Sequence, residues 1–383
     1  MMIIVLLAIT LIFLLPDIYI SLVMMRGAAW WAHVLLWLPA LMAFGLLVSV
    51  RFSGFGAAKM QLFTGLLVCV TLPQVVLVAF SLLGKLLGLV WQPATAVGNG
   101  VGLVVAGMLA LFAFYGLLFG WKTLDVKELE MAFPDLPAEF DGYRIVQLSD
   151  LHLGTHGNNT AFPERVVRCV NERDADLVVF TGDLVNVSAS ETTPFEATLS
   201  QLRARDGVLS VLGNHDYNFY GRREHPTDPQ QGSKAVAAAE RRMGWDVLLN
   251  AHRIISRGEA RMAVVGVENT GKPPFPEIGD LKAAMAGIPE GMFTILLSHD
   301  PSHWRMEVLP ETTIPLTLSG HTHAAQMKIW RWSPARWLYP EWGGLYTEGS
   351  QHLFVSEGLG GSIPFRLGSK PKVTVITLKK ISQ

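Results

Sequence analysis

Two histidines separated by one residue follow an apolar run late in the chain. In the stretch LTLSGHTHAAQ, from Leu316 to Gln326, the apolar residues stop at Ser319-Gly320, and His321 and His323 come next. Residues two apart in an extended segment point to the same side, so both imidazoles would face one spot. Imidazole nitrogens are common ligands of transition metals. The pair therefore indicates a metal site, provided that other ligands converge on it.

Four earlier segments have the same form, an apolar run that ends abruptly in polar residues. They are YRIVQLSDLHLG (143–154), DLVVFTGDLVN (176–186), GVLSVLGNHDY (207–217) and TILLSHDP (294–301). Short runs rich in Val, Ile and Leu are typical of strands buried on both faces. Helix-like segments lie at about 161–173, 192–204 and 232–243. This alternation predicts an α/β domain with ligands at the carboxyl ends of its strands. Later short strands suggest a second, partly antiparallel sheet packed on the first.

The polar ends of these five strands carry side chains that can bind metals. They are Asp150, His152, Asp183, Asn214, His215, Asp216, His299, His321 and His323. Such a mixture of oxygen and nitrogen ligands suits Mn, Fe, Zn or Co, whereas Ca²⁺ favours oxygen alone. Seven of these nine residues as ligands would be too many for a single ion that must also hold substrate, and they suit two ions that share one carboxylate. Any single pair could be structural, but five strand ends together indicate a metal centre.

The order D-x-H, G-D, G-N-H-D, a single H and G-H-x-H resembles the pattern of the calcineurin-like metallophosphoesterase superfamily. The resemblance covers roughly residues 130–380. Finer stretches, such as SGHTHAAQ and SEGLGGSIPFRLGSK, are similar to a membrane-anchored bacterial branch related to UDP-diacylglucosamine hydrolases. That branch commonly has glycines where Ala324 and Ala325 stand, so we expect a stiffer loop here. The resemblance implies a two-sheet β-sandwich flanked by helices.

The same resemblance implies a role for each polar residue. One divalent ion would be held by Asp150, His152, Asp183 and His323, and the other by Asp183, Asn214, His299 and His321, with Asp183 bridging the two. Manganese is the favoured metal. His215 would lie above the metals and protonate the leaving group or stabilise its charge. Asp216 would orient His215 by a hydrogen bond, or otherwise serve as a turn residue, and we place both among the catalytic residues.

A dinuclear centre suits the hydrolysis of phosphate esters. Two cations about 3.5–4 Å apart neutralise the phosphoryl oxygens and lower the pKa of a bridging water, which gives hydroxide near neutrality. That hydroxide would attack phosphorus in line with the leaving oxygen. We therefore expect a hydrolase that cleaves a phosphodiester or pyrophosphate bond. The alternative is a membrane sensor or scaffold whose phosphoesterase domain binds a phosphorylated ligand without turnover.

Charged residues are distributed unevenly along the chain. The 383 residues are 16% charged, compared with about 25% in a typical soluble domain. Residues 1–121 contain five charged side chains, Asp17, Arg26, Arg51, Lys59 and Lys85. The sequence therefore predicts a transmembrane region at 1–121, a linker with the first strand at 122–142, and the phosphoesterase domain at 143–383. A net charge of −1 without a basic cluster argues against nucleic-acid binding.

Four apolar stretches have the length of about 20 residues that a spanning helix needs. They lie at about 2–24, 29–50, 61–83 and 101–120. Arg51, Lys59, Lys122 and Lys127 flank them on one side, and Arg26 and Lys85 on the other. The excess of basic residues favours a cytoplasmic location for the first side. We expect an integral protein of a bacterial inner or plasma membrane with a cytoplasmic catalytic domain. A transporter is disfavoured, because the spans contain one acid, Asp17, and no internal repeat.

A tryptophan-rich stretch directly follows the histidine pair. KIWRWSPARWLYPEWGGLYTEG (328–349) contains four tryptophans and two arginines. Trp, Tyr and Arg favour membrane interfaces, so the stretch predicts a lipid-facing lid; the alternative is an aromatic subdomain packed on its own core. We expect a phosphorylated small-molecule, nucleotide or lipid-linked substrate, with UDP-diacylglucosamine a candidate by resemblance. The expected substrate-side residues are His156, Trp330 and Arg331. Nothing in the sequence indicates an oligomeric state.

Overall fold

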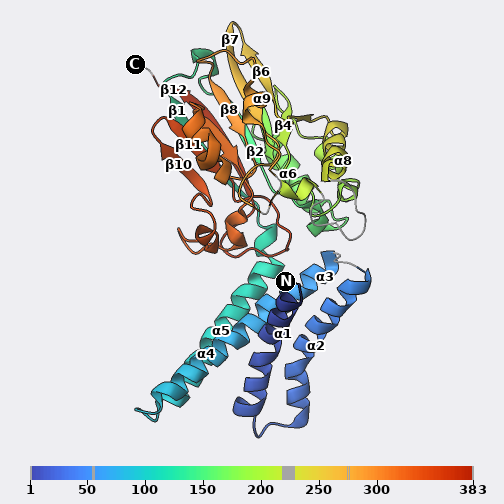
Figure 1. The fold of residues 1–383 in the computed structure, drawn as a ribbon, viewed down its shortest axis with the longest axis vertical. Coiled ribbons are helices and arrows are strands. Elements are labelled where there is room, and N and C mark those ends of the chain that lie inside the picture. The colour runs from blue at the N-terminus through green and yellow to red at the C-terminus, as the bar shows by residue number, and fades with distance from the viewer. Residues whose placement is uncertain (1, 54–56, 218–228, 274, 276, 382–383) are drawn as a thin grey trace. The chain divides into compact units, whose positions relative to one another are not determined.

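The computed structural model describes residues 2–53, 57–217, 229–273, 275 and 277–381. The chain divides into two compact units, Met1–Phe119 and Gly120–Gln383. Many of the elements of both are labelled in Figure 1. Each unit is described by itself.

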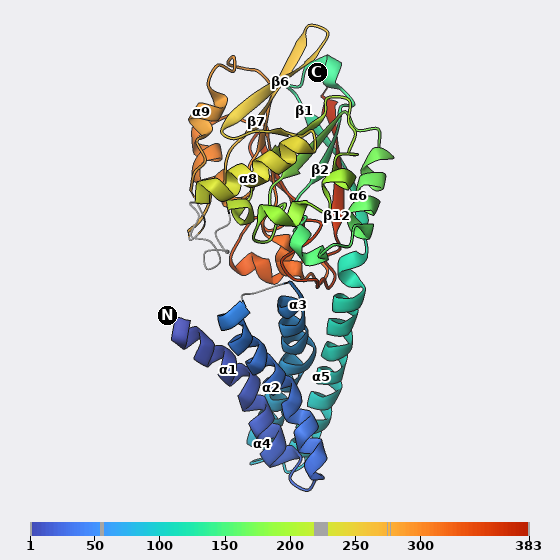
Figure 2. The same ribbon diagram turned by 90° about the vertical axis from the view of Figure 1, so that its right-hand side faces the viewer.

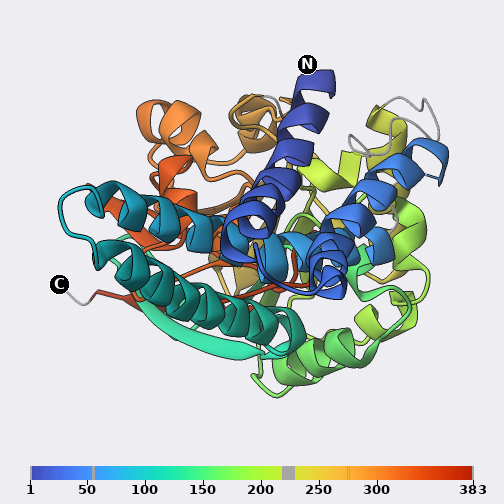
Figure 3. The same ribbon diagram turned by 90° about the horizontal axis from the view of Figure 1, so that it is seen from below.

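The first unit consists of apolar helices. They are α1 (Met2–Tyr19), the π-helical turn η1 (Ile20–Met24), α2 (Trp30–Ser53), α3 (Ala57–Leu66), the π-helical turn η2 (Leu67–Thr71), α4 (Leu72–Leu87) and α5 (Ala94–Leu118). α4 and α5 form a hairpin, which Figure 3 shows from below. Gly84 and Gly98 let the two backbones approach closely, because a Cβ on either glycine would collide with the facing helix.

Three helices in the described residues are long and apolar enough to cross a membrane. They cover Trp30–Ser49, Ala58–Leu87 and Ala94–Lys122. The expected count of four spans is not confirmed, because the apolar stretch found near the N-terminus, Leu11–Met24, is shorter. Asp17 lies inside this unit and accepts a 2.8 Å hydrogen bond from Gln74 Nε2. This acid therefore makes a buried contact between helices.

The described part of the second unit contains two six-stranded sheets. The first has the order β1-β12-β2-β3-β4-β5, with β1 (Asp125–Phe133), β12 (Lys372–Lys380), β2 (Arg144–Leu148), β3 (Leu177–Thr181), β4 (Val208–Val211) and β5 (Asp246–Val247). The second has the order β10-β11-β9-β8-β7-β6, with β10 (Gly344–Glu348), β11 (Gln351–Val355), β9 (Leu316–Ser319), β8 (Thr294–Leu297), β7 (Ala260–Gly266) and β6 (Ala251–Arg257). β2, β3 and β4 pair in parallel, as do β8 and β9.

The five strands with polar ends are divided between the two sheets. β2, β3 and β4 belong to the first sheet, and β8 and β9 to the second. The expectation that the later short strands build the second sheet is therefore wrong for β5 and β12, which lie in the first sheet. Each of the two sheets consequently contributes its own set of ligands, at the carboxyl ends of its strands.

The two sheets pack face to face and are covered by helices on their outer sides. Their inner faces meet in a core that includes Ile145 of β2 and Leu318 of β9. The outer face of the first sheet packs against α6 (Ala161–Asn171) and α8 (Pro229–Arg242), as Figure 2 shows. The outer face of the second packs against α9 (Leu281–Met285) and the π-helical turn η8 (Trp304–Val308). This is the expected two-sheet β-sandwich flanked by helices.

One predicted helix of this unit is largely missing. α6 and α8 agree with the helices expected at 161–173 and 232–243, but 192–204 contains only the short α7 (Glu196–Leu199). Directly after α7, Ser200 Oγ and Gln201 Nε2 each donate a 3.1 Å hydrogen bond to the Ala197 carbonyl. Polar side chains that bond to nearby carbonyls compete with the helical hydrogen bonds, which explains the early end.

A buried glutamine joins the sheets beside the polar strand ends. Gln147 is 0% exposed, and its Nε2 donates to the Ser319 carbonyl at 2.9 Å and to Thr181 Oγ1 at 3.2 Å. These two partners are the last residues of β9 and β3. A single amide therefore fixes the carboxyl ends of β2, β3 and β9 relative to one another.

A buried acid on α8 predicts a pH-dependent change in stability. Glu240 is 0% exposed, Ser210 Oγ donates to its Oε2 at 2.6 Å, and burial raises its pKa well above the ordinary 4.5. Because the folded pKa is raised, the contribution of Glu240 to stability is present below pH 4.5 and is lost as the pH rises towards the folded pKa. Glu240→Gln keeps an acceptor for Ser210 and should raise the apparent unfolding temperature at pH 8 more than at pH 5.

The measurement is thermal unfolding of the detergent-solubilised full chain at both pH values. The exposed Glu172→Gln serves as the matched control and should show no such difference. Equal shifts for Glu240→Gln at pH 5 and pH 8 would contradict the assignment of a neutral buried acid.

Candidate metal centre

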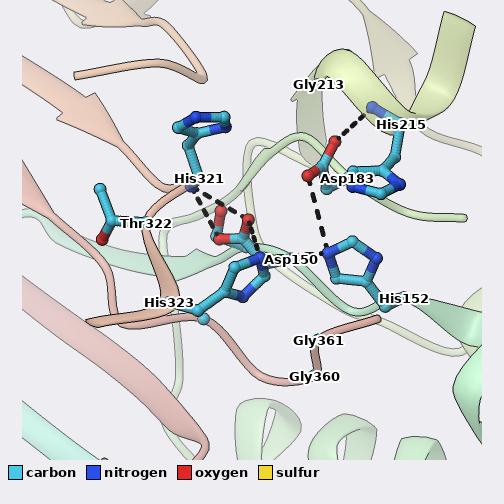
Figure 4. A network of polar contacts seen from close by, with 12 residues as sticks. Asp150, His152, Asp183, Gly213, His215, His321, Thr322, His323, Gly360 and Gly361 are labelled. Carbon is cyan, nitrogen blue, oxygen red and sulfur yellow. Dashed lines mark hydrogen bonds and ion pairs between the residues drawn. The ribbon is translucent and has the colours of Figure 1, made fainter. Parts of the chain in front are cut away.

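The structure brings all seven predicted ligands to one place. They follow five strands: Asp150 and His152 after β2, Asp183 after β3, Asn214 after β4, His299 after β8, and His321 and His323 after β9. Figure 4 shows Asp150, His152, Asp183 and His323 pointing toward one another from these loops, with His321 beside Asp150. Both sheets of the sandwich therefore supply ligands.

The ligand atoms form two overlapping groups. Asp150, His152, Asp183 and His323 each offer an atom within 4.8 Å of the others. A second group contains Asp183, His299 and His321. Asn214 belongs with this second group, because its Oδ1 lies 2.8 Å from His321 Nδ1 and 3.2 Å from His299 Nε2. Asp183 is the residue that the two groups share.

The spacing between the ligand atoms fits divalent cations. The Nε2 atoms of His152 and His323 lie 3.3 Å apart, as do His299 Nε2 and His321 Nδ1. Asp183 Oδ2 lies 3.6 Å from His152 Nε2 and 3.2 Å from His299 Nε2. Ligands at about 2.0–2.1 Å from an ion are about 2.8–3.4 Å apart at octahedral or tetrahedral angles. The residues present therefore suit an Asp/His metal site.

Burial sets the protonation of most of the imidazoles. It lowers the pKa of His321 to about 4 and holds those of His152 and His323 well below the ordinary range, so all three are neutral ligands near pH 7. Burial also lowers the pKa of His299, but the neighbouring Asp183 carboxylate outweighs it and raises that pKa to about 10. A cation that binds His299 must therefore displace a proton.

Asp183 is ionised in this site. Burial alone would raise its pKa, but the imidazoles of His299 and His215 hold it well below the ordinary value. Its Oδ1 also accepts a 2.9 Å hydrogen bond from the backbone amide of His215. The shared ligand consequently carries a negative charge between the two groups of histidines.

Two of the ligand histidines are oriented through their second ring nitrogen. His299 Nδ1 donates to the Thr181 carbonyl at 2.7 Å, and His321 Nε2 lies 2.7 Å from the Tyr339 hydroxyl. Such bonds select the tautomer and hold the ring in place. Asp300 Oδ2 is also 3.8 Å from His321 Nε2. Tyr339 and Asp300 were not predicted as site residues, although they lie in the tryptophan-rich stretch and in SHDP.

The two ligands of each pair, on the loops after β2 and β9, face the site for a different reason from the one expected. β2 ends at Leu148 and β9 at Ser319, before the ligands begin. Asp150, His152, His321 and His323 then have φ values of 55°, 49°, 73° and 50°. The expectation of an extended segment is therefore wrong, although each pair does face the site. The ligands sit on tight left-handed turns, a conformation that is costly for non-glycine residues and often occurs at functional sites.

Asp216 connects the loops that carry the shared ligand and Asn214. Its carboxylate accepts four backbone N–H bonds of 2.8–3.2 Å, from Asp183, Leu184, Val185 and Gly213. A bond that orients His215 comes from another residue, because His215 Nδ1 donates to the Asn186 carbonyl at 2.7 Å. A direct bond from Asp216 to His215 stays a prediction, and the four amide bonds fit the alternative role of Asp216 as a turn residue. We assign Asp216 a positioning role on the loop after β3.

The expected substrate-side residues have very different surroundings. His156 is buried, stacks on Phe162 at a centroid distance of 5.2 Å and lies 5.5 Å from Trp121. It packs inside the second unit, and its expected contact with substrate stays a prediction. Trp330 is 89% exposed, and Arg331 is also exposed. These two belong to the segment whose Tyr339 contacts His321.

A buried arginine behind the site was missed by the sequence analysis. Arg366 is 1% exposed, and its Nη2 donates to the Gly360 carbonyl at 2.5 Å. The Gly360 amide in turn donates to the Asp150 carbonyl at 2.6 Å. Arg366 therefore braces the loop behind Asp150. Its position in SEGLGGSIPFRLGSK was noted, but no pattern separates a buried arginine from one on the surface.

Comparisons with known proteins agree with this geometry. The model of the calcineurin-like phosphoesterase family matches residues 143–325. The uncharacterised metallophosphoesterase YkuE of Bacillus subtilis is 31% identical over 73% of this chain and 94% of its own length. A transmembrane protein with a metallophosphoesterase domain from Danio rerio is 30% identical over 78% of this chain and 68% of its own. The UDP-2,3-diacylglucosamine pyrophosphatase LpxG of Chlamydia trachomatis is 26% identical over 71% of this chain and 96% of its own.

Backbone strain behind His323 leads to a stability prediction. Ala324 and Ala325 have φ values of 52° and 48°, and Ala325 is exposed. An L-residue in the left-handed conformation lowers the stability of the folded state by roughly 1–2 kcal/mol. Glycine removes this strain, but it raises the conformational entropy of the unfolded chain, which lowers stability by about 0.5–1 kcal/mol. Ala325→Gly should therefore stabilise the protein by about 0.5–1 kcal/mol and raise its unfolding temperature by about 1–3 °C. Thermal unfolding of the full chain measures this.

The matched control is Ala197→Gly, at an exposed position inside α7. Glycine in a helix destabilises by roughly 0.5–1 kcal/mol, so this variant should change in the opposite direction. A lower unfolding temperature for Ala325→Gly would show that the left-handed turn is not strained.

Proposed function

The chain belongs to the calcineurin-like phosphoesterase family, and on that premise we propose that it hydrolyses a phosphodiester or pyrophosphate bond with two divalent metal ions. The observation that carries the proposal is the pair of ligand groups that share Asp183. When bound, two such cations neutralise phosphoryl charge and lower the pKa of a water molecule between them. Imidazoles, carboxylates and one amide suit Mn, Fe, Zn or Co, and manganese is our first choice.

His215 is the general acid in this proposal. Its ring packs edge-on against His152 at 4.8 Å, which places it beside the ligand cluster, and its side chain is only half-buried. Because Nδ1 donates to the Asn186 carbonyl, the proton exchanged with the substrate is the one on Nε2. As water adds to phosphorus and the bond to the leaving oxygen breaks, that oxygen takes this proton, and the proton that the attacking water gives up passes to solvent, from which His215 is protonated again. Such proton transfer typically contributes about 10²–10⁴-fold.

The proposed substrate is a lipid-linked or nucleotide pyrophosphate or phosphodiester. Two observations support this class: three apolar helices in the same chain are long enough to cross a membrane, and a relative is named as a UDP-2,3-diacylglucosamine pyrophosphatase. A membrane-anchored hydrolase meets lipid-linked phosphates at high local concentration. UDP-diacylglucosamine is therefore the first candidate to assay.

We also propose a cytoplasmic location for the second unit, in a bacterial inner or plasma membrane. The three long helices alternate in direction, so residues 51–59 and the chain after Lys122 share one side whether or not the first helix crosses. That side contains Arg51, Lys59, Lys122 and Lys127, against Arg26 and Lys85 on the other. Basic residues concentrate on the cytoplasmic side of membranes.

Hydrolysis of bis-p-nitrophenyl phosphate by the full chain in detergent, with and without Mn²⁺, tests the proposal. We expect metal-dependent turnover that Asp183→Asn reduces to background, because the shared ligand loses its charge. His215→Ala should lower kcat by about 10²–10⁴-fold while the bound metal is retained. His352→Ala, on β11 and outside the ligand groups, is the control and should retain full activity.

Two results would count against the proposal. Normal turnover in Asp183→Asn would contradict the shared-ligand arrangement. A folded wild-type sample that binds two metals and phosphorylated ligands but turns over none of the substrates would instead favour the sensor or scaffold.

A further inference from the structure

Four strongly exposed apolar side chains lie together in one short segment of the second unit. The exposed fractions are 62% for Ile329, 89% for Trp330, 76% for Trp337 and 73% for Leu338. In the described part of that unit, the other exposed large apolar side chains reach only 42–47%, and they are Met306, Leu345 and Ile381. We call Ile329, Trp330, Trp337 and Leu338 the apolar cluster. Clusters of this kind mark interaction sites more often than single exposed residues do.

The segment that carries the apolar cluster is packed from behind. Ala324, Ala335 and Trp342 form a small buried core beneath it. Ser333 Oγ donates to the Ala324 carbonyl at 2.6 Å, and Thr322 Oγ1 donates to the Trp342 carbonyl at 2.5 Å. The stretch is therefore a subdomain with its own core, and it also presents large side chains outward. Trp330 and Trp337 are exposed on an ordered scaffold.

The apolar cluster begins beside the residue at which the second unit starts. The Gly120 backbone lies against the Arg366 carbonyl, so closely that a Cβ at residue 120 would not fit. The next residue, Leu367, exchanges hydrogen bonds with this segment: its amide donates to Gln326 at 2.9 Å, and its carbonyl accepts from Lys328 at 2.8 Å. Gly120 and Lys328 thus contact consecutive residues of one strip.

Only a short link of chain separates Gly120 from the last apolar helix. The last apolar helix, α5, ends at Leu118, two residues before Gly120, which corresponds to about 7 Å of extended chain. Arg165 Nη2 also donates a 2.5 Å hydrogen bond to the Lys122 carbonyl. This bond fixes the first residues of the second unit to the rest of that unit. A membrane crossed by α5 is therefore within reach of the apolar cluster.

We propose that the apolar cluster is a bilayer anchor, which enters the interface of the membrane that the chain's own helices span. Tryptophan is favoured at this depth, where its ring is buried and its N–H stays near water. The exposed Arg331 and Arg336 on the same segment add attraction to anionic headgroups. Charge, composition and the covalent tether together select a lipid surface over a protein partner.

The anchor is linked to the metal centre through a single residue. Tyr339 directly follows Leu338, and its hydroxyl lies 2.7 Å from Nε2 of the ligand His321. A substrate whose acyl chains remain in the leaflet beside the apolar cluster would therefore present its phosphate to the candidate metal centre. This step rests on the proposed function, and it narrows the substrate class to membrane-resident lipid phosphates or pyrophosphates.

Depth-dependent quenching in nanodiscs tests the anchor without using activity. In a full chain with Cys69 and Cys169 replaced by alanine, Trp330→Cys is labelled with an NBD fluorophore. The nanodiscs contain phosphatidylethanolamine and phosphatidylglycerol, with or without doxyl groups on the upper acyl chain. We expect at least about twofold quenching at residue 330, as for a side chain at interfacial depth.

The control probe is Ile381→Cys, at the far end of the unit. β1 and β12 pair in parallel from Asp125 and Lys372 to Phe133 and Lys380, so residue 381 lies about 26 Å or more from the tethered end. This probe should not be quenched. Equal quenching at both residues, or no quenching at residue 330, would overturn the anchor. So would a probe at residue 330 that is shielded from water only when a second copy of the protein is present.

The substrate step is tested by a ratio of activities. Turnover of UDP-diacylglucosamine in nanodiscs is divided by turnover of bis-p-nitrophenyl phosphate for each protein. The Ile329→Ser/Trp337→Ser variant should lower this ratio about tenfold, and Ile381→Ser should leave it unchanged. An unchanged ratio in the double variant would refute the substrate step. Absence of both activities in the wild type would refute the proposed function, while the quenching result would still decide the anchor.

Discussion

One buried carboxylate, Asp183, holds the centre of this molecule together. It is 1% exposed and ionised, and two groups of histidines approach it from different loops. A buried charge is costly unless it is paired and hydrogen-bonded. The imidazoles of His152 and His299 and the amide of His215 meet that requirement. The same constraint explains why the site needs several loops at once, since a single loop cannot surround one carboxylate with so many partners.

The fold satisfies this constraint by bringing two sheet edges together. Asp183 comes from the first sheet, whereas His299 and His321 come from the second. Gln147 fixes the strand ends across the sandwich, and Asp216 gathers four backbone amides from the loops after β3 and β4. Neither side chain is a ligand, yet the ligand positions depend on both. The same chain also carries, among its described residues, three apolar helices long enough to cross a membrane.

The order and types of the ligand residues could be predicted from the sequence, because each follows a recognisable apolar strand. The division of the strands between two sheets could not, because β5, β8, β9 and β12 look alike as short apolar runs and pairing depends on contacts distant in sequence. The left-handed turns at His152 and His323 also escaped prediction, since alternation along a strand was extrapolated past the strand's end. The contacts of Asn186 with His215 and of Tyr339 with His321 could not be predicted either. The first uses a backbone carbonyl, and the second depends on how the loop after His323 folds back, and neither leaves a local sequence pattern.

The number of metal ions bound per chain tests the shared role of Asp183 most directly. Elemental analysis of the full chain, purified in detergent and equilibrated with Mn²⁺, should find two ions in the wild type. His323→Ala removes a ligand from one group only and should leave about one tightly bound ion, whereas Asp183→Ala should leave neither. One ion in the wild type, or two in Asp183→Ala, would contradict a centre built on one shared carboxylate.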